Sequence, residues 1–275
     1  MSWKPLIPSC TSASMYEGLL SSLEETVRSM VSGKDVAVAF SGGLDSGVLA
    51  ILCKRYARSV RLYTVGLEES YDVRESRGMS RVLGMDWTHI PMDEGSLLDG
   101  MKDMVAVTGT TDPIVLSFEV PLMYVLSSAE EDIIVTGQGA DEVFLGYSKY
   151  VGLDDDDLED QLTEDMRKLY GVTRIHEAKM AEHSGKTVLC PFLDSRVMSE
   201  VSRIPLDELK PHGELRKVPL RHVAESLGCP ELASKPKKAA QYGSGSMNTI
   251  RRLAKSRSQT VGCFIIGLVD GVHRE

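Results

Sequence analysis

The segment from Val36 to Ser46 constrains the fold more than any other part of the chain. Its first five residues, Val-Ala-Val-Ala-Phe, form a short apolar run that is typical of a parallel strand buried on both faces. Two glycines follow almost at once, and the apolar stretch 48–52 then predicts a helix. A strand, a glycine turn and a helix in direct succession are typical of an α/β protein that binds phosphate at the turn.

The turn carries the groups that a phosphate site needs. Gly42 and Gly43 let the backbone bend sharply with its amides exposed, and a helix N-terminus adds unpaired N–H groups. Ser41 and Ser46 supply hydroxyl donors. Asp45 would repel a phosphate unless a divalent cation lay between them, so we assign Asp45 to Mg²⁺. The lysine that closes the common P-loop is missing, which disfavours transfer of a γ-phosphate.

Strands and helices are expected to alternate along the first half of the chain. This alternation predicts a doubly wound parallel sheet with helices on both faces and ligands at the carboxyl ends of the strands. Apolar runs predict the strands, and helical spacing predicts the helices. The expected strands are 36–40, 60–65, 87–90 and 132–136, and the expected helices are 14–33, 73–83 and 114–126.

From Asp154 the pattern becomes mainly helical. We expect a helical segment at 1–34, a nucleotide-binding core at 35–153 and a helical part at 154–275 that completes the site, all in one continuous domain. The four carboxylates at 154–157 are expected in a solvated loop or the first turn of a helix. The apolar segment 263–269 is too short to span a bilayer and is expected to form a buried strand or an interface, which leaves a homodimer open.

A second glycine turn follows the buried strand expected at 132–136. The segment Gly137-Gln-Gly-Ala-Asp-Glu-Val-Phe-Leu-Gly-Tyr147 repeats the combination of glycines and a carboxylate at the end of a strand. Since the carboxyl ends of parallel strands meet at one edge of a sheet, Asp141 is predicted to be the second carboxylate at the magnesium site.

Four segments, in order, resemble one protein family. Ser41–Ser46 resembles the SGGxDS loop of the N-type ATP pyrophosphatases, and 137–147 resembles the GEGxDE segment of their asparagine synthetase and β-lactam synthetase branch. Residues 189–194 resemble the R-x-PFLD segment of that branch, and 234–245 resemble its lysine loop. Together they cover nearly the whole chain after the first helix, so it is similar to the synthetase domain of asparagine synthetases.

The resemblance implies an activity and a set of site residues. Such enzymes cleave ATP between the α and β phosphates, adenylate a carboxylate and release pyrophosphate, and a nitrogen nucleophile then forms an amide. Asp45 and Asp141 would bind Mg²⁺, and Lys237 would stabilise the departing pyrophosphate, with Lys238 as a close competitor. Gln138 would lie beside the reacting groups. The ATP-binding residues implied are Ser41, Gly42, Gly43, Leu44, Asp45, Ser46, Val65, Gly66, Gly137 and Lys237.

Two departures from the family pattern concern the nitrogen donor. The chain begins Met1-Ser2-Trp3, without the glutaminase domain of the glutamine-hydrolysing members, so we expect ammonia, an amine on the substrate or a separate glutaminase subunit to supply nitrogen. Gln138 stands where asparagine synthetases usually have Glu and β-lactam enzymes have Tyr. A glutamine amide only donates and accepts hydrogen bonds, so it cannot act as a general base.

Composition excludes several classes of partner. A net charge of −9 and a pI near 5.3 argue against bulk binding of nucleic acid. The N-terminus lacks a signal-peptide pattern, so a cytoplasmic protein without membrane contact is expected. The histidines have no metal-site spacing except His176 and His183 at i, i+7, which we interpret as coincidence. Arg216, Lys217 and Arg221 are expected to be surface charges on a helix.

Three functions remain open after these arguments. Aspartate is the first choice of carboxylate substrate, because the last two segments are shared with asparagine synthetases. Another ATP pyrophosphatase ligase, of the NAD⁺, GMP or tRNA-modifying type, is the main alternative. A non-catalytic nucleotide-binding regulator is the other, which the change at Gln138 makes conceivable.

Overall fold

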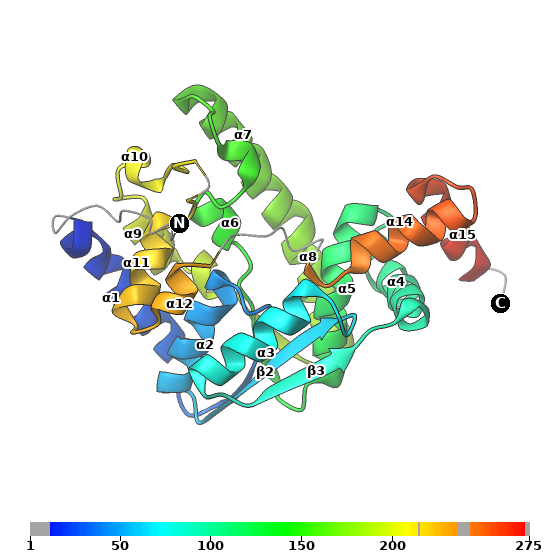
Figure 1. Ribbon diagram of the computed structural model, residues 1–275, viewed down its shortest axis with the longest axis horizontal. Helices are drawn as coiled ribbons and strands as arrows, with labels where there is room; N and C mark the ends of the chain where they lie inside the picture. Colours follow the sequence, from blue (N-terminus) through cyan, green and yellow to red (C-terminus); the bar gives the residue numbers. More distant parts are fainter. Residues whose placement is uncertain (1–11, 214, 236–242, 273–275) are drawn as a thin grey trace, which may run out of the picture.

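The computed structural model describes residues 12–213, 215–235 and 243–272 of the chain (Figure 1). Its centre is a five-stranded sheet in the order β3-β2-β1-β4-β5, and every adjacent pair of strands is parallel. The predicted doubly wound α/β fold is therefore confirmed. The strands are β1 Asp35–Ala39, β2 Ser59–Gly66, β3 Trp87–Pro91, β4 Ile133–Val135 and β5 Thr187–Leu189.

All four strands expected from the sequence are present, and one more was not expected. β5 lies in the part of the chain that looked mainly helical, and it pairs with β4 along residues 187–189. Three residues are too few for a clear alternation of apolar and polar side chains, so periodicity did not reveal this strand.

Helices cover both faces of the sheet. The expected helices at 14–33, 73–83 and 114–126 correspond to α1, α3 and α5, and α4 was not predicted. The longer helices are α1 Ser12–Val31, α2 Leu44–Tyr56, α3 Tyr71–Leu83, α4 Glu94–Thr108, α5 Pro113–Ser128, α7 Asp155–Lys168, α8 Arg174–His183, α11 Val218–Ser226, α14 Ser246–Ser256 and α15 Val261–Val272. The shorter ones are α6 Ala140–Val143, α9 Ser195–Val201, α10 Leu206–Leu209 and α12 Pro230–Ala233.

Two apolar clusters fill the space between the sheet and these helices. Val36, Val38 and Val135 face a cluster built with α1, α2, α3, α9, α11 and α12. Ala37 and Ile134, which alternate with them along the strands, face a second cluster built with α4, α5, α8, α14 and α15. Because side chains on both faces are buried, the central strands are apolar at residues 36–39 of β1 and 133–135 of β4, as the sequence of β1 indicated.

The order of the strands determines where ligands are expected to bind at the carboxyl edge of the sheet. The connections from β1 to β2 and from β2 to β3 cross the first face through α2 and α3, whereas the connection from β3 to β4 crosses the second face through α4 and α5. The strand order therefore reverses between β1 and β4, and the loops that leave their carboxyl ends separate there. Both glycine turns found in the sequence lie at this point.

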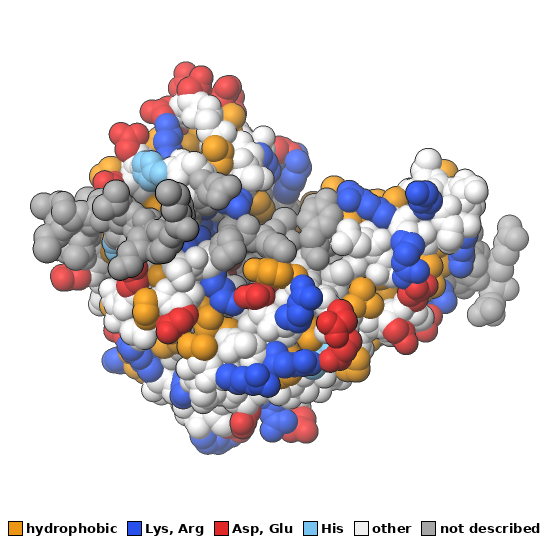
Figure 2. Space-filling view, in the orientation of Figure 1, with side chains coloured by type: hydrophobic (Ala, Val, Ile, Leu, Met, Phe, Trp, Pro, Cys, Tyr) orange, Lys and Arg blue, Asp and Glu red, His pale blue; other side chains and the backbone are white. Residues whose placement is uncertain are grey.

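The acidic run at 154–157 forms the start of a helix, which was one of the two structures predicted for it, the other being a solvated loop. Asp154 is the N-cap of α7 and accepts a hydrogen bond from the backbone of Asp157 at 2.9 Å. Its carboxylates are exposed, and Figure 2 shows acidic side chains gathered at the end of α7 that projects from the molecule in Figure 1. Negative charge at a helix N-terminus is stabilising, which accounts for the run without a bound ion.

The prediction of a buried strand at 263–269 was wrong, because this segment lies in α15. Phe264 and Ile265 are buried against α4, α5 and α14, whereas the Ile266 side chain is 55% exposed. Apolar runs of this length do not distinguish a strand from a helix. None of the helices in the described ranges combines the length and apolarity needed to cross a bilayer.

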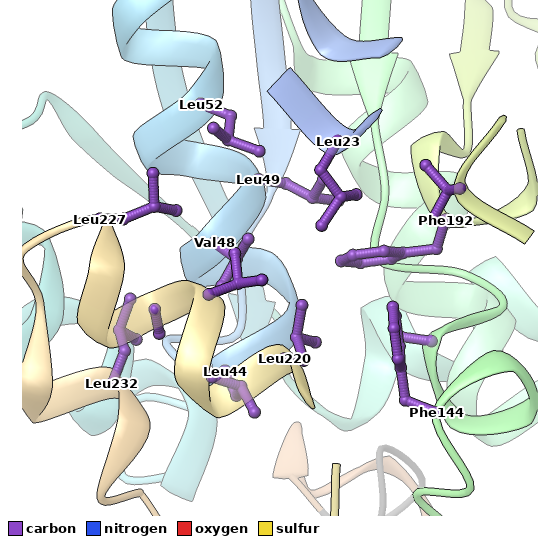
Figure 3. Packing of buried hydrophobic residues seen from close by; sticks show 14 of the residues in the cluster. Leu23, Leu44, Val48, Leu49, Leu52, Phe144, Phe192, Leu220, Leu227 and Leu232 are labelled. Atoms are coloured by element: carbon purple, nitrogen blue, oxygen red, sulfur yellow. The ribbon is translucent and has the colours of Figure 1, made fainter. Parts of the chain in front are cut away.

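Phe192 illustrates how the first cluster depends on its large side chains (Figure 3). It is fully buried and meets Phe144 edge-on, with ring centroids 5.5 Å apart. We expect Phe192→Ala to lower the free energy of unfolding by about 3–5 kcal/mol, because it leaves a cavity between α6 and the helices around α2. Urea denaturation measures this change. Val82→Ala, at a 54% exposed side chain, should stay within about 0.5 kcal/mol of the unsubstituted protein. Equal effects of the two substitutions would contradict this account of the core.

Candidate active site

A cleft opens at the carboxyl edge of the sheet, beside the loop after β1. It is bordered by the glycine turn, by the first turns of α3 and by the segment that precedes and begins α11. The residues that line it are Ser41, Gly42, Gly43, Leu44, Asp45, Tyr71, Asp72, Glu75, Arg216, Lys217, Arg221 and Lys235.

The glycine turn has the geometry of an anion site. Gly42 has a φ of 72°, and a Cβ atom there would lie 2.5 Å from the backbone nitrogen of Ser76 in α3, so only glycine fits. Gly43 is the N-cap of α2, and the first amides of that helix lie at the turn. The hydroxyls of Ser41 and Ser46 are 3.3 Å apart and hold the two ends of the turn together. The predicted helix N-terminus is thus present at the predicted position.

Asp45 and Asp141 converge on one lysine. The Nζ of Lys217 lies 2.7 Å from Oδ2 of Asp45 and 2.9 Å from Oδ1 of Asp141. Lys217 is only 1% exposed and has a φ of 60°, a left-handed conformation that is unfavourable for a residue with a side chain. Residues 45, 141 and 217 come from three distant parts of the chain, so tertiary folding alone brings these charges together.

Two glycines of the second motif make this convergence sterically feasible. A Cβ at Gly146 would lie 2.0 Å from Cε of Lys217 and 2.1 Å from Oδ1 of Asp141. A Cβ at Gly137 would lie 3.2 Å from that of Asp45. The side chain of Lys217 therefore reaches the carboxylates by passing over the backbone of Gly146, whose carbonyl accepts a hydrogen bond from Arg216.

The interpretation of Arg216, Lys217 and Arg221 as surface charge was wrong. All three line the cleft, and Arg221 is 7% exposed, with hydrogen bonds to the carbonyls of Arg216 and Ala233. One signal in the sequence could have indicated this. Arg216 and Lys217 directly precede α11, where cations oppose the helix dipole and acidic residues are usual, so their presence calls for a nearby anion.

The paired carboxylates fit a magnesium ion that also binds phosphate oxygens. Mg²⁺ in such sites usually takes one or two carboxylates and fills its remaining positions with phosphate and water. Across the described ranges no group of three or more His, Cys, Asp or Glu side chains converges. Asp45 and Asp141 would supply the two carboxylates of such an ion, with phosphate and water oxygens as its other ligands.

Other predicted site residues lie near the cleft without lining it. Ser46 contacts Ser41, and Val65 and Gly66 are the last residues of β2. Gln138 follows β4, and its backbone nitrogen is 3.5 Å from the hydroxyl of Thr136. Lys237 and its competitor Lys238 are outside the described residues.

Lys235 is described, and it lines the cleft. Its Nζ is 2.5 Å from a carboxylate oxygen of Glu75, a residue of α3 that also lines the cleft. Its side chain is 15% exposed, so this part of the lysine loop is packed against the protein rather than solvated. Sequence reasoning had assigned no role to Lys235 or Glu75.

Comparison with known proteins identifies relatives over most of the chain. A family model described as Asparagine synthase matches residues 18–156 and 151–261. A Methanocaldococcus jannaschii protein named as an asparagine synthetase (glutamine-hydrolyzing) is 28% identical in an alignment 272 residues long, which covers 85% of this chain and 50% of that protein. The carboxyethyl-arginine β-lactam synthase of Streptomyces clavuligerus is 26% identical over 234 residues, 84% of this chain and 45% of that one.

The chain spans about half the length of these curated relatives. Among solved structures, NMN synthetase from Francisella tularensis aligns with a TM-score of 0.45 and 13% identity, over 94% of this chain and 87% of that one.

Gly146 offers a test of the contact between Lys217 and the second motif. We expect Gly146→Ala to lower the free energy of unfolding by about 2–3 kcal/mol, because the added methyl group collides with the buried lysine stem. Gly78→Ala is the matched control: a Cβ at this helical position has no neighbour within 4 Å, and a gain of about 0.5–1 kcal/mol is expected. Urea denaturation of both variants measures the difference. A Gly146→Ala protein as stable as the unsubstituted one would show that Lys217 does not lie against this glycine.

Proposed function

The chain belongs to the asparagine synthase family, and on that premise we propose that it is an ATP-dependent ligase that forms AMP and pyrophosphate as it joins a carboxylate to nitrogen. One observation carries the proposal: Lys217 holds the two family carboxylates, Asp45 and Asp141, at a single point beside the glycine turn. A site that only bound a nucleotide through its backbone would not require this buried, strained arrangement.

We assign the phosphates of ATP to the glycine turn. Its amides and the hydroxyls of Ser41 and Ser46 would donate hydrogen bonds to phosphate oxygens, helped by the N-terminus of α2. Mg²⁺ bound by Asp45 and Asp141 would neutralise phosphate charge and fix the α-phosphorus for attack by the substrate carboxylate.

The charges around the cleft support cleavage at the α-phosphate. Four cationic side chains line it, together with three acidic ones. In-line attack on the α-phosphorus releases pyrophosphate, on which negative charge accumulates, and fixed cations stabilise that charge more than they stabilise bound ATP. We therefore give Lys217 a part in this stabilisation. Lys237 keeps the role that the resemblance implies.

Burial makes Lys217 and Arg221 effective in this role. Lys217 is buried away from water, and an ionic interaction is far stronger in the protein interior than at the surface. Burial lowers the pKa of Arg221, but a guanidinium remains protonated at neutral pH. Arg221 in turn fixes the strained start of α11 through its hydrogen bond to the carbonyl of Arg216.

Aspartate remains our first choice of carboxylate substrate. It is supported by the asparagine synthetase names among the relatives. The β-lactam synthase is a relative of comparable identity, so family membership by itself leaves other carboxylates open. Glutamine at position 138 does not affect the adenylation half-reaction in principle, because that step does not require a general base to remove a proton from the nitrogen nucleophile.

The products of ATP cleavage test the proposal. We expect AMP and pyrophosphate when the protein is incubated with labelled ATP, Mg²⁺, ammonium and aspartate or another carboxylate from a panel. Asp45→Asn, Asp141→Asn and Lys217→Met should each lower pyrophosphate release at least about a hundredfold, as losses of transition-state stabilisation do. Asp157→Asn, at an exposed residue of α7, is the control and should keep normal activity.

Three outcomes would contradict this assignment. Release of ADP and phosphate would show that ATP is cleaved between the β and γ phosphates rather than between the α and β phosphates. Tight ATP binding without any cleavage, over the whole panel, would favour the regulator. Normal activity of Asp45→Asn or Asp141→Asn would remove these carboxylates from the metal site.

A further inference from the structure

Asp141, the second carboxylate assigned to Mg²⁺, lies on α6, a helix of only four residues. One helical turn is unstable by itself, because fixing its backbone costs more free energy than its hydrogen bonds supply. The backbone on each side is left-handed, with φ of 87° at Gly139 and 49° at Leu145. A residue with a side chain is strained in this conformation, so the surroundings of α6 have to hold Leu145, and with it Asp141, in place.

Two hydrogen bonds close the loop that follows α6. The backbone nitrogen of Gly146 donates to the carbonyl oxygen of Asp141, with 2.7 Å between the atoms. The hydroxyl of Tyr147 donates to Oε1 of Glu142 at 2.8 Å. Gly146 is also the residue over which Lys217 reaches the two carboxylates. The closed loop therefore determines where the backbone presents Asp141 and which path Lys217 takes.

Glu142 is buried although nothing proposed above uses it. It is only 5% exposed, and its neighbour Asp141 is another carboxylate, so its position costs free energy. The hydrogen bond from Tyr147 offsets part of that cost. A hydrogen bond in the protein interior is stronger than one at the surface, which makes this one suited to fixing a short and strained segment.

The ring of Tyr147 is itself restrained by its neighbours. Nζ of Lys149 lies 5.0 Å from the centre of this ring and 5.7 Å from that of Tyr150. The two tyrosine rings meet edge-on, with centroids 5.5 Å apart. Tyr150 and Lys149 both bind Asp165 of α7, which packs against α6 (Figure 1). Packing against α7 thus directs the hydroxyl of Tyr147 to Glu142.

We propose that Tyr147 and Glu142 are positioning residues for magnesium, which hold α6 so that Asp141 can share one ion with Asp45; this inference rests on the proposed function. Neither side chain is assigned a contact with the ion or with ATP. Both act on Asp141 through the backbone of the closed loop. Groups that orient a metal ligand without touching the ion typically change metal affinity about 10–100-fold.

Removal of one hydroxyl tests this assignment. We expect Tyr147→Phe to raise the Mg²⁺ concentration for half-maximal ATP–pyrophosphate exchange about tenfold, while kcat at saturating Mg²⁺ stays within about threefold of normal. Tyr150→Phe is the matched control, because it loses a similar bond to a buried carboxylate that lies on α7 instead of beside a metal ligand. Its Mg²⁺ dependence should be unchanged. Equal shifts in the two variants, or no shift in Tyr147→Phe, would overturn the proposal.

Binding of the ion is also measurable without turnover. In the presence of saturating α,β-methylene-ATP, which is not cleaved between those phosphates, Mg²⁺ should raise the melting temperature because the complex binds the folded state. Tyr147→Phe should need about tenfold more Mg²⁺ for half of this rise, and Tyr150→Phe should need the normal concentration. Each variant is compared with its own melting temperature without Mg²⁺, so a loss of stability common to both does not affect the result. An unshifted titration for Tyr147→Phe would contradict the positioning role.

Substitutions of Glu142 separate the hydrogen bond from the charge. Glu142→Gln keeps an oxygen that accepts from Tyr147, so its Mg²⁺ dependence should stay within about threefold of normal, whereas Glu142→Ala should match Tyr147→Phe. A merely structural role would destabilise the alanine variant without changing its Mg²⁺ dependence. That result would refute the inference, and so would a glutamine variant as impaired as the alanine variant.

The unsubstituted protein separates this inference from the proposed function. Absence of pyrophosphate exchange with every carboxylate of the panel would refute the proposed function, whereas the melting curves would still decide the role of Tyr147. Exchange in the unsubstituted protein together with normal Mg²⁺ dependence in Tyr147→Phe would refute the positioning role alone.

Discussion

The ion bridge from Asp45 through Lys217 to Asp141 is the interaction on which the rest of the site depends. It joins the turn after β1, the short helix after β4 and the residue before α11, three segments that share no local structure. Two carboxylates held so close together would repel each other, and the buried ammonium offsets that repulsion. It also fixes the distance between the two loops that diverge at the reversal of the strand order, so it sets the width of the ligand-binding edge.

Several unusual backbone features follow from this one contact. Lys217 adopts a left-handed conformation, Gly146 has no space for a side chain, and Arg216 and Arg221 brace the same turn through carbonyl oxygens. Each of these costs stability by itself, because strain and the burial of charge are both unfavourable. They persist where the surrounding packing enforces them, and α11 is packed tightly on α1 and α2 in the first apolar cluster. The rigid core thus maintains a strained site.

Charged side chains occur in two different settings in this structure. Beside the glycine turn, four cationic and three acidic side chains line a cleft, which suits a polyphosphate with its metal ion. Glu119 of α5 and Glu177 of α8 are each only 2% exposed, and Glu177 pairs with Arg174.

Local sequence was sufficient to predict the glycine turn, four of the five strands, the parallel sheet and the two family carboxylates. Each of these features depends on residues that are neighbours in the chain or on the periodicity of a single element. It was not sufficient for β5, for the helical α15, or for Lys217 and Arg221, whose charges looked like those of an exposed helix. It also gave no reason to connect Glu119 with His176, 57 residues away. Whether a charge is buried, and which opposite charge it meets, depends on the packing of distant segments, and only the tertiary structure decides that.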